Sequence, residues 1–335
     1  YTERPYIVNG KLVRDIRSSD NFNTLEKKTY PLSFASSIFE RILQEQGPFE
    51  IVANFAALKH VRSEKDEYAI QAMFENNFIN ANKLLAQLKA HKPESFFCVS
   101  TDKATNPVSI MGATKKLMED VIFAYEKDFN ITTARFANVA FSNGSLLDSY
   151  VHRFEKEQPI VCPSDINRYF VSPEEAGSLC LLACLLGESG DIFIPKLTPE
   201  KDLISFEKTV REFFKELDIE LDLCESEEEA KRKAKAITKS NDSAYPVYLF
   251  KTDTSGEKLY EEFFAKSDVV DWDTFNALGV IKKSKDENAN VKQLLLEAEA
   301  LFSEDTSKDS ILKFLSKHIT GFMYEEKGKN LDQKM

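Results

Sequence analysis

Two periodicities of apolar residues alternate along the chain between Phe49 and about Gly187. Short, nearly continuous apolar runs predict buried strands, and they read FEIVANFAA, SFFCVS, NITTARFANVAF and, just beyond, DIFIPK. Between these runs, apolar residues recur every three or four positions, which predicts helices over residues 68–91, 113–129 and 172–187. Strands that alternate with helices indicate an α/β fold with a Rossmann-like, doubly wound parallel sheet and helices on both of its faces.

The pattern changes after about residue 198, where charged residues become frequent. Charged amphipathic helices are predicted over 207–217 and 225–237, a strand and a turn within 244–264, and two further helices over 291–302 and 311–319. We therefore expect residues 1–198 to form the sheet domain, and residues 199–335 to form a smaller mixed lobe with a helical tail.

Composition and charge exclude several classes of protein. Hydrophobic residues make up 42% of the chain, which is enough for a buried core. The net charge of −11 argues against a general nucleic-acid binder, which needs a basic face, but leaves room for a local basic pocket. The five cysteines form no CxxC pair, and no apolar run approaches the ~20 residues that span a bilayer. We expect a soluble, cytoplasmic protein with no metal site, no nucleic-acid partner and no membrane span.

Polar side chains are predicted where strands of the parallel sheet end. Asn54, Thr101 and Asn138 each fall at or near the end of an apolar run. Ligands of such sheets bind at the carboxyl ends of the strands, so these residues are candidates for a ligand site. The adjacent Asp102 and Lys103 have the chemistry of a proton donor and a base. The alternative for this pair is an ordinary charged turn at the surface.

Other candidate residues each have a plain structural alternative. Asp15 follows a short apolar step and is placed to accept a hydrogen bond from an adenine amino group, or simply to begin a turn. The small side chains of Ala56 and Ala57 would let a cofactor approach the backbone, or serve close packing of a helix on a strand. Lys115 would hold ribose hydroxyls, or be solvated.

A glycine-rich turn is the one element of a dinucleotide site that does not appear. A dinucleotide-binding sheet usually opens with a strand and a glycine-rich turn at a helix N-terminus, but Gly10 is the only glycine before Asp15. We expect the native protein to begin further upstream with such a segment; the alternative is a different fold.

Five segments occur in an order that resembles a known family: ANFAALKHV, VSTDKATNPVSIMGATKK, ARFANVAFSNGS, NRYF and SGEKLYEE. They resemble the nucleotide-sugar 4,6-dehydratases of the polysaccharide-biosynthesis (CapD-like) branch of the extended short-chain dehydrogenases/reductases. The resemblance covers about residues 15–262. It implies tightly bound NAD or NADP in residues 1–198, and a UDP-sugar substrate, UDP-N-acetylglucosamine above all. It also implies that residues 139–172 contribute to the sugar pocket, and we expect a homo-oligomer.

The resemblance implies roles position by position. The catalytic positions are Thr101, at the sugar's 4-hydroxyl, Asp102, Lys103, Met111 and Lys115, which would bind the nicotinamide ribose. The cofactor positions are Asp15 and Ile16 at the adenine, Ala56, Ala57 and Lys59 along the dinucleotide, Asn77 as a support, and Lys115. The UDP-sugar positions are Lys103, Asn138, Ser145, Arg168 and Glu261.

Several positions depart from the family pattern. Met111 stands where the family usually has its proton-transferring tyrosine, as it does in one branch of the family. Ala137 replaces a glycine, Asn143 an arginine, and residues 254–258 read TSGEK in place of RPGEK. A thioether cannot carry a proton, so we expect Asp102 to take the proton of the 4-hydroxyl and then to protonate the departing 6-hydroxyl. Lys103 would remove the C5 proton.

Two other functions stay open at this point. A nucleotide-sugar 4-epimerase needs no base at C5, so the Asp102–Lys103 pair argues for a dehydratase. A non-catalytic nucleotide-binding scaffold is suggested by Met111 and by the missing glycines, but a scaffold would be expected to lose the acid–base pair.

Overall fold

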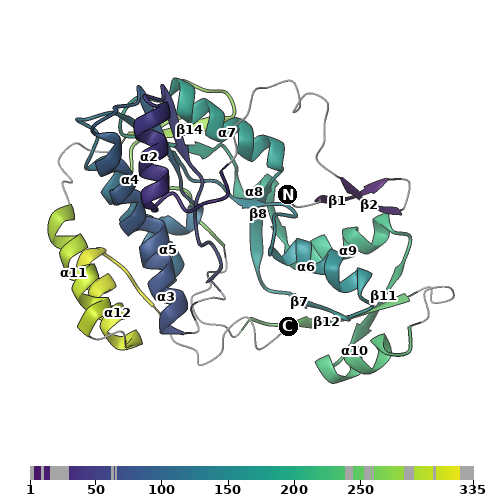
Figure 1. The fold of residues 1–335 in the computed structure, drawn as a ribbon. Helices are drawn as coiled ribbons and strands as arrows, with labels where there is room; N and C mark the ends of the chain where they lie inside the picture. The colour runs from purple at the N-terminus through teal and green to yellow at the C-terminus, as the bar shows by residue number, and fades with distance from the viewer. Residues whose placement is uncertain are drawn as a thin grey trace.

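The computed structural model describes residues 4–8, 11–15, 30–61, 64, 66–237, 244–252, 258, 260–282, 290–304 and 307–324 (Figure 1). Most helices and strands fall into two groups, a large sheet with its helices and a smaller lobe beside it. Strands β1 (Arg4–Val8) and β2 (Lys11–Asp15) form an antiparallel hairpin of their own.

The large sheet has six strands in the order β13-β14-β9-β5-β4-β3. Its parallel part consists of β3 (Ile51–Asn54), β4 (Ser95–Val99), β5 (Asn130–Ala134) and β9 (Asp191–Pro195). Two antiparallel strands extend it, β14 (Leu278–Lys282) and β13 (Val270–Asp271). The predicted α/β fold with a Rossmann-like parallel sheet is confirmed.

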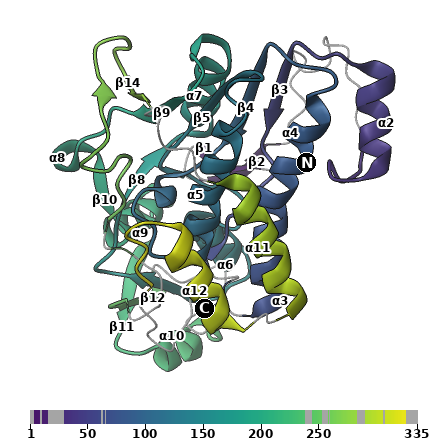
Figure 2. The same cartoon turned by 90° about the vertical axis from the view of Figure 1, so that its left-hand side faces the viewer.

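Helices cover both faces of this sheet, and β4 shows why. Its side chains point alternately to the two faces, so Phe96 and Cys98 pack into one apolar cluster and Phe97 into another. Burial on both faces explains why the strand is a continuous apolar run. One face carries α3 (Glu67–Phe74), the π-helical turn η2 (Glu75–Ile79), α4 (Asn80–Leu88) and α5 (Ile110–Phe123), and the other carries α7 (Pro173–Leu186) (Figure 2).

Polar caps fix where these helices begin. The Ser109 hydroxyl accepts a hydrogen bond from the Gly112 amide at 3.0 Å, so α5 begins at Ile110. In α7, the Ser172 hydroxyl accepts from the Glu175 amide at 3.1 Å, and the Glu175 carboxylate accepts from the Ser172 amide at 2.6 Å. This reciprocal pair is a capping box at the start of the helix predicted over 172–187.

The smaller lobe is built around the parallel sheet β11-β12-β7. Its core is aromatic, and the rings of Phe214 and Tyr245 stack with centroids 5.1 Å apart. The sheet comprises β7 (Ile160–Pro163), β11 (Glu220–Cys224) and β12 (Ala244–Phe250), with helices α6 (Leu146–Glu155), α9 (Phe206–Glu216) and α10 (Glu227–Ala234). A second small sheet comprises β6 (Asn138–Val139), β8 (Asn167–Val171) and β10 (Leu203–Ser205), and α8 (Pro199–Asp202) leads into β10.

The prediction of one strand over residues 130–141 is wrong. Strand β5 ends at Ala134, and β6, four residues later, belongs to a different sheet. Between them Arg135 turns its side chain into a buried ion pair with Glu119 of α5, with Nη2 and Oε2 2.7 Å apart. The break in the strand carries the chain from the large sheet to the lobe.

Strand pairing also crosses the boundary predicted at residue 198. Helix α6 and strand β7 precede that residue but belong to the lobe, whereas β13 and β14 follow it and return to the large sheet. The sheets therefore do not divide at residue 198, and the chain passes between the two parts several times.

The predicted C-terminal helices are present as α11 (Val291–Glu304) and α12 (Lys308–His318), and they pack on the large-sheet side of the molecule (Figure 2). The rings of Phe302 and Phe314 lie 5.0 and 5.7 Å from that of Phe74 in α3. Near the other end, α2 (Ser37–Gln46) contributes Leu43 to the same apolar cluster.

Candidate functional site

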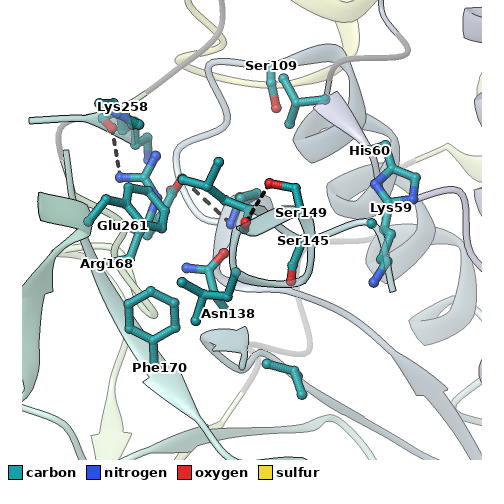
Figure 3. A pocket seen from close by; sticks show the side chains of 18 of the residues that line it. Lys59, His60, Ser109, Asn138, Ser145, Ser149, Arg168, Phe170, Lys258 and Glu261 are labelled. Carbon is teal, nitrogen blue, oxygen red and sulfur yellow. Dashed lines mark hydrogen bonds and ion pairs between the residues drawn. The ribbon is translucent and has the colours of Figure 1, made fainter. Parts of the chain in front are cut away.

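A cavity opens where the carboxyl ends of β3 and β4 meet the smaller lobe (Figure 3). Its wall combines the segments that follow β3 and β4 with parts of β6, α6, β8 and the segment after β12. Lys59, a predicted cofactor residue, lines this cavity. So do all five residues assigned to the UDP-sugar by resemblance, which are Lys103, Asn138, Ser145, Arg168 and Glu261. Residues more than a hundred positions apart in the chain are thus brought to one wall.

A single helical turn after β4 presents the candidate acid–base pair. Thr101 caps this turn, η3 (Asp102–Ala104), by accepting a hydrogen bond from the Lys103 amide at 3.4 Å. The Thr101 hydroxyl in turn donates to Asp102 Oδ1 at 2.7 Å. Because the turn directs successive side chains differently, Asp102 is 1% exposed while Lys103 reaches the cavity wall. Asp102 itself is not among the lining residues.

Lys103 lies between two carboxyl groups. Its Nζ is 3.1 Å from Asp102 Oδ1 and 3.8 Å from Glu261 Oε1. Burial lowers the pKa of Lys103, but the two carboxylates outweigh it, so its pKa lies above the ordinary value for lysine. Lys103 is therefore an ammonium in the resting site, and it can act as a base only after giving up a proton.

Glu261 is the second carboxyl of this cluster. Burial and the nearby Asp102 carboxylate raise its pKa, while the cations of Lys103, Arg168 and Lys258 oppose the shift without cancelling it. Its Oε2 atom and Asp102 Oδ2 are both buried and have no hydrogen-bond partner. Buried carboxyl oxygens are normally paired, so these two atoms are where a ligand hydroxyl or a proton would be received.

The lobe side of the cavity offers cations and aromatic rings. Arg168 is 4% exposed, and its Nη1 donates to the carbonyl of Lys258 at 3.0 Å, while its guanidinium lies over the ring of Phe206. Phe170 and Phe250 add further rings to the wall. A guanidinium beside apolar rings suits a ligand that has both an anionic group and a flat ring.

The beginning of α6 forms another part of the wall. Ser145 caps this helix by accepting from the Asp148 amide at 3.2 Å, and Gly144 and Leu146 line the cavity with it. Asn138 lies on the neighbouring β6, where its Nδ2 donates to the Tyr169 carbonyl at 3.3 Å.

Met111 and Lys115 of α5 are buried and are not part of the cavity wall. The Lys115 ammonium donates to the Val99 carbonyl, at the end of β4, and to Met118 Sδ at 3.2 Å. Burial lowers the pKa of Lys115. A ligand ribose would have to replace one of these contacts to engage Lys115.

A buried glutamate that the sequence did not single out caps α5 beside Ser109. Glu64 accepts hydrogen bonds from the amides of Ile110 at 3.0 Å and Met111 at 2.7 Å. A carboxylate is favourable there because the helix N-terminus carries partial positive charge. In the sequence Glu64 lies within a charged run, VRSEKDEY, which is typical of a solvated segment.

The segment after β3 is held in place by two asparagines. Asn54 accepts from the Ala56 amide at 3.0 Å, and Asn77 exchanges two hydrogen bonds with the backbone of Leu58 at 2.8 and 3.0 Å. Asn77 lies in the π-helical turn η2, and it also donates to Thr114 of α5 at 2.9 Å. These contacts hold the segment after β3 against α5, and the role of Asn77 as a support of the central strands stays a prediction.

The structure places some of the remaining predicted cofactor residues, but not all of them. Ala56 and Ala57 are partly exposed, and Lys59 lines the cavity. Asp15 is the last residue of β2, which is described by its backbone alone, and Ile16 lies outside the described residues. The adenine contacts predicted for Asp15 and Ile16 stay predictions.

The ion pair between Glu119 and Arg135 lies directly behind the site. Arg135 Nε and Nη2 donate to the two carboxylate oxygens at 2.8 and 2.7 Å, and Ser100 donates to Oε1 at 2.7 Å. Burial raises the pKa of Glu119, but Arg135 and its other donors outweigh it and hold the pKa at about 2. The pair is therefore fully charged at neutral pH.

The same guanidinium ties together the two segments that carry the carboxyl cluster. Arg135 Nη1 donates to Thr105 Oγ1, just after η3, and to the Phe263 carbonyl, two residues beyond Glu261, both at 3.1 Å. Lys258 adds a second tie, since its Nζ donates to the Thr105 carbonyl at 2.9 Å. The distance between Lys103 and Glu261 is thus set by a buried network.

Replacing Gly112 with alanine is expected to displace the acid–base turn. A Cβ atom on Gly112 would lie 2.3 Å from the Lys103 carbonyl oxygen, which is backbone and cannot swing aside. We expect Gly112→Ala to lower the free energy of unfolding by about 1–3 kcal/mol, as overpacking does, although alanine favours helices. Urea denaturation measures the change.

The matched control for this variant is Gly177→Ala in α7, where a Cβ atom would meet nothing within 4 Å. Its stability should stay unchanged or rise by up to about 1 kcal/mol. Equal free energies of unfolding for the two variants would show that the position of η3 does not depend on the close packing of Gly112 against the Lys103 carbonyl.

Among the described residues, no three histidine, cysteine, aspartate or glutamate side chains are grouped in a way that would hold a metal ion. The same part of the chain contains no helix of the length and apolar character needed to cross a bilayer.

Relatives of known sequence connect the chain to polysaccharide synthesis. A family described as polysaccharide biosynthesis protein matches residues 35–283. An uncharacterized membrane protein of Methanocaldococcus jannaschii is 30% identical over 80% of this chain and 75% of its own length. The capsular polysaccharide biosynthesis protein CapD of Staphylococcus aureus is 32% identical over 46% of this chain, which spans only 26% of CapD. A UDP-glucose 4-epimerase of Rickettsia canadensis is 26% identical over 62% of the chain and 65% of its own length.

Solved structures support the fold. Pen from Bacillus thuringiensis superposes with a TM-score of 0.59 at 19% identity, covering 81% of this chain and 80% of its own. The enzyme WbmG of Bordetella bronchiseptica, solved with NAD and UDP, superposes with a TM-score of 0.52 at 13% identity. The superposition covers 82% of this chain and 80% of WbmG. Since the family match extends over residues 35–283, from α2 to the end of the six-stranded sheet, the chain belongs to the polysaccharide biosynthesis protein family.

Proposed function

We propose that this protein is a nucleotide-sugar 4,6-dehydratase. It would convert a UDP-N-acetylhexosamine, with UDP-N-acetylglucosamine as the first candidate, to a UDP-4-keto-6-deoxy sugar for polysaccharide or glycan synthesis. The observation that supports this most strongly is the Asp102–Lys103 pair after β4, whose ammonium reaches the cavity wall. Elimination of water beside a ketone needs a base at carbon and an acid at the leaving oxygen, and an amine with neighbouring carboxyl groups supplies both.

The proposed reaction is redox-neutral and releases one water. A bound nicotinamide dinucleotide would supply reversible hydride chemistry between C4 and C6, so the reaction would need no net oxidant or reductant. Oxidation at C4 also requires that the proton of the 4-hydroxyl move to Asp102. The resulting ketone acidifies the C5 hydrogen, which Lys103 removes as a proton while a carboxyl group protonates the departing 6-hydroxyl. Lys103 finally returns a proton to C5.

Thr101 gives the 4-hydroxyl proton a route that needs no tyrosine. Its hydroxyl already donates to Asp102 Oδ1 at 2.7 Å. A hydroxyl in this position can accept the sugar's proton as it passes its own to the carboxylate, so the two residues act together. Met111 then needs no chemical role, and Lys115 would act by position and charge.

The residues after β3 fit the nicotinamide half of the cofactor. Ala56 and Ala57 are small and partly exposed, and Asn77 holds the backbone beside them. Together with Lys59 they would lie along the dinucleotide at the carboxyl end of the sheet. In the part of the chain that the structure describes, no helix begins at a glycine-rich turn, so we assign no residue to the pyrophosphate.

The lobe side of the cavity suits a UDP group. Arg168 and Lys258 place two cations near each other in a protein whose net charge is −11, which favours an anionic ligand there. Phe170, Phe206 and Phe250 would pack against the uracil ring.

A nucleotide-sugar 4-epimerase is the second candidate, because the chain is 26% identical to a UDP-glucose 4-epimerase over 62% of its length. Epimerisation at C4 needs hydride transfer alone and no proton transfer at C5. The carboxyl–lysine–carboxyl cluster would have no task in that reaction.

Mass spectrometry after incubation with UDP-N-acetylglucosamine and either NAD or NADP separates these functions. We expect the full-length protein to give a product lighter by one water, with no net reduction of the cofactor. An isomer of unchanged mass would identify an epimerase, and tight binding of the sugar nucleotide without conversion would identify a scaffold.

A further inference from the structure

The cavity has two carboxyl groups beside Lys103, and they are not equivalent. Asp102 and Glu261 are both at least nine-tenths buried, and Lys103 Nζ lies 3.1 Å from the first and 3.8 Å from the second. Of the two carboxyl groups, Glu261 lines the cavity beside Lys103, and Asp102 does not. A carboxyl that must touch the departing 6-hydroxyl of a bound sugar is better placed at Glu261.

Each carboxyl group keeps one buried oxygen without a partner, Glu261 Oε2 and Asp102 Oδ2, but only the first belongs to a side chain on the cavity wall. A protonated carboxyl would donate from Glu261 Oε2 to a ligand. Asp102 Oδ1, in contrast, already receives hydrogen bonds from Thr101 and Lys103, which suits a carboxylate that takes protons from those two groups.

We propose that Glu261 is the acid that protonates the departing 6-hydroxyl, and that Lys103 passes protons between Asp102 and Glu261. This inference rests on the proposed 4,6-dehydration. It replaces the expectation that Asp102 performs both the first and the last proton transfer, and it gives a catalytic task to a residue that the resemblance places only in the sugar pocket.

The elimination balances with these three groups. Lys103 first passes its ammonium proton to Glu261, so the elimination begins with Glu261 as the acid, Lys103 as the neutral amine, and Asp102 holding the proton from the 4-hydroxyl. Lys103 takes the C5 proton, the electrons of that bond form the C5–C6 double bond, and the C6–O bond breaks. Glu261 gives its proton to the leaving oxygen, and water departs.

The remaining steps restore the cluster. Lys103 returns a proton to C5 when the hydride arrives at C6, and it is again a neutral amine. Asp102 then still holds the proton from the 4-hydroxyl, while Glu261 lacks one. Lys103 accepts the proton of Asp102 and donates one to Glu261, which recovers the starting state without any further acid or base.

The raised pKa of Glu261 favours transfer of a proton from Lys103 to this carboxyl, whereas the raised pKa of Lys103 opposes it. Burial raises the pKa of Glu261, Asp102 adds to the effect, and Lys103, Arg168 and Lys258 oppose it. The pKa of Lys103 is also raised. Transfer of one proton from the Lys103 ammonium to the Glu261 carboxylate turns two charged groups into two neutral groups in a buried site. That exchange costs less there than in water, because burial disfavours charge.

Glu261→Gln tests the assignment, because glutamine keeps the size of the side chain but cannot donate an acidic proton. In single-turnover experiments with UDP-N-acetylglucosamine, we expect reduced nicotinamide to form at the wild-type rate and then to persist. Water loss should fall by about 10²–10⁴-fold, the usual contribution of general acid catalysis. The matched control is Glu262→Gln, whose carboxylate contacts Asn106 and Lys258 and should leave all steps unchanged.

A binding role for Glu261 would give a different result. If Glu261→Gln raises KM and leaves kcat for water loss within about threefold of wild type, the assignment is overturned. Glu261→Asp keeps an acid and should recover part of the water loss, which a purely structural role does not predict. If the wild type itself returns an isomer of unchanged mass, the proposed function fails; if the wild type loses water and Glu261→Gln does so equally fast, only this inference fails.

A titration of the cofactor-free protein gives a reading that does not depend on activity. Carbon-13 NMR of protein labelled at the glutamate side-chain carboxyls should show a resonance, absent in Glu261→Gln, that titrates at higher pH than the surface glutamates. A Glu261 resonance that titrates with the others would overturn the assignment.

Discussion

Lys103→Ala should stop the release of water and leave the oxidation at C4 intact. In the proposed reaction the amine removes the C5 proton, and it lies on the cavity wall between Asp102 and Glu261. We expect reduced nicotinamide to form in a single turnover, while water loss falls by about 10²–10⁴-fold. Absorbance of the reduced nicotinamide and mass spectrometry of the sugar follow the two steps separately.

Lys103→Arg distinguishes the proton-carrying role from the charge of the ammonium. Arginine keeps a cation beside the two carboxyl groups, but it does not give up its proton in proteins. We expect this variant to lose water as slowly as Lys103→Ala while retaining a wild-type melting temperature. Rapid water loss in Lys103→Arg would contradict the role of Lys103 as base.

Asp102→Asn should block an earlier step. Without the carboxylate, the Thr101 hydroxyl has nowhere to pass the 4-hydroxyl proton, so neither reduced nicotinamide nor loss of water is expected. Normal formation of reduced nicotinamide in this variant would show that the proton leaves by another route, and Lys115 would be the next residue to test.

Arg135→Met should have the largest effect on stability. Glu119 would remain charged in the interior without its guanidinium, and breaking such a pair on one side costs about 3–5 kcal/mol. The matched control is the double variant Arg135→Met with Glu119→Gln, in which no buried charge is left unpaired, and it should recover part of the loss. Urea denaturation monitored by circular dichroism measures both, and a single variant as stable as the double one would contradict this account.

The same pair gives stability a defined dependence on pH. The folded-state pKa of Glu119 is about 2, below the ~4.3 of an ordinary glutamate. Because the folded-state pKa is depressed, its contribution is fully present above the unfolded-state pKa, and it is lost as pH falls from about 4.3 to about 2. The shift corresponds to roughly 3 kcal/mol. Arg135→Met should lose stability less steeply over this range than the wild type.

Local sequence pattern predicted most of the large sheet and its helices. The runs SFFCV and DIFIP are strands with both faces buried, and the capping box that begins at Ser172 marks the start of α7 in the sequence itself. The pattern failed at Arg135, since an arginine within an apolar run gives no local sign that its partner, Glu119, lies on a neighbouring helix. It also gave no sign that β14 would pair back onto β9, or that β13 would pair with β14, because strand pairing depends on distant segments.

The candidate site was predicted by resemblance, and its geometry was not. The motifs placed Lys103, Asn138, Ser145, Arg168 and Glu261 together, and the structure finds all five on one cavity wall. Sequence order made Asp102 the obvious acid because it is adjacent to Lys103. It could not reveal that a single helical turn buries Asp102 and leaves Glu261, more than a hundred residues away, facing the cavity. Glu64 and the aromatic wall were likewise indistinguishable from surface charge and ordinary core.

Conversion of UDP-N-acetylglucosamine in D2O tests the central claim most directly. If the protein is a 4,6-dehydratase, the product, trapped at once by reduction of its ketone with borohydride, should have lost one water and carry deuterium at C5. The methyl group at C6 should hold the hydrogen that came from C4, because the hydride never exchanges with solvent. An isomer of the substrate with unchanged mass and no carbon-bound deuterium would contradict the account and identify an epimerase.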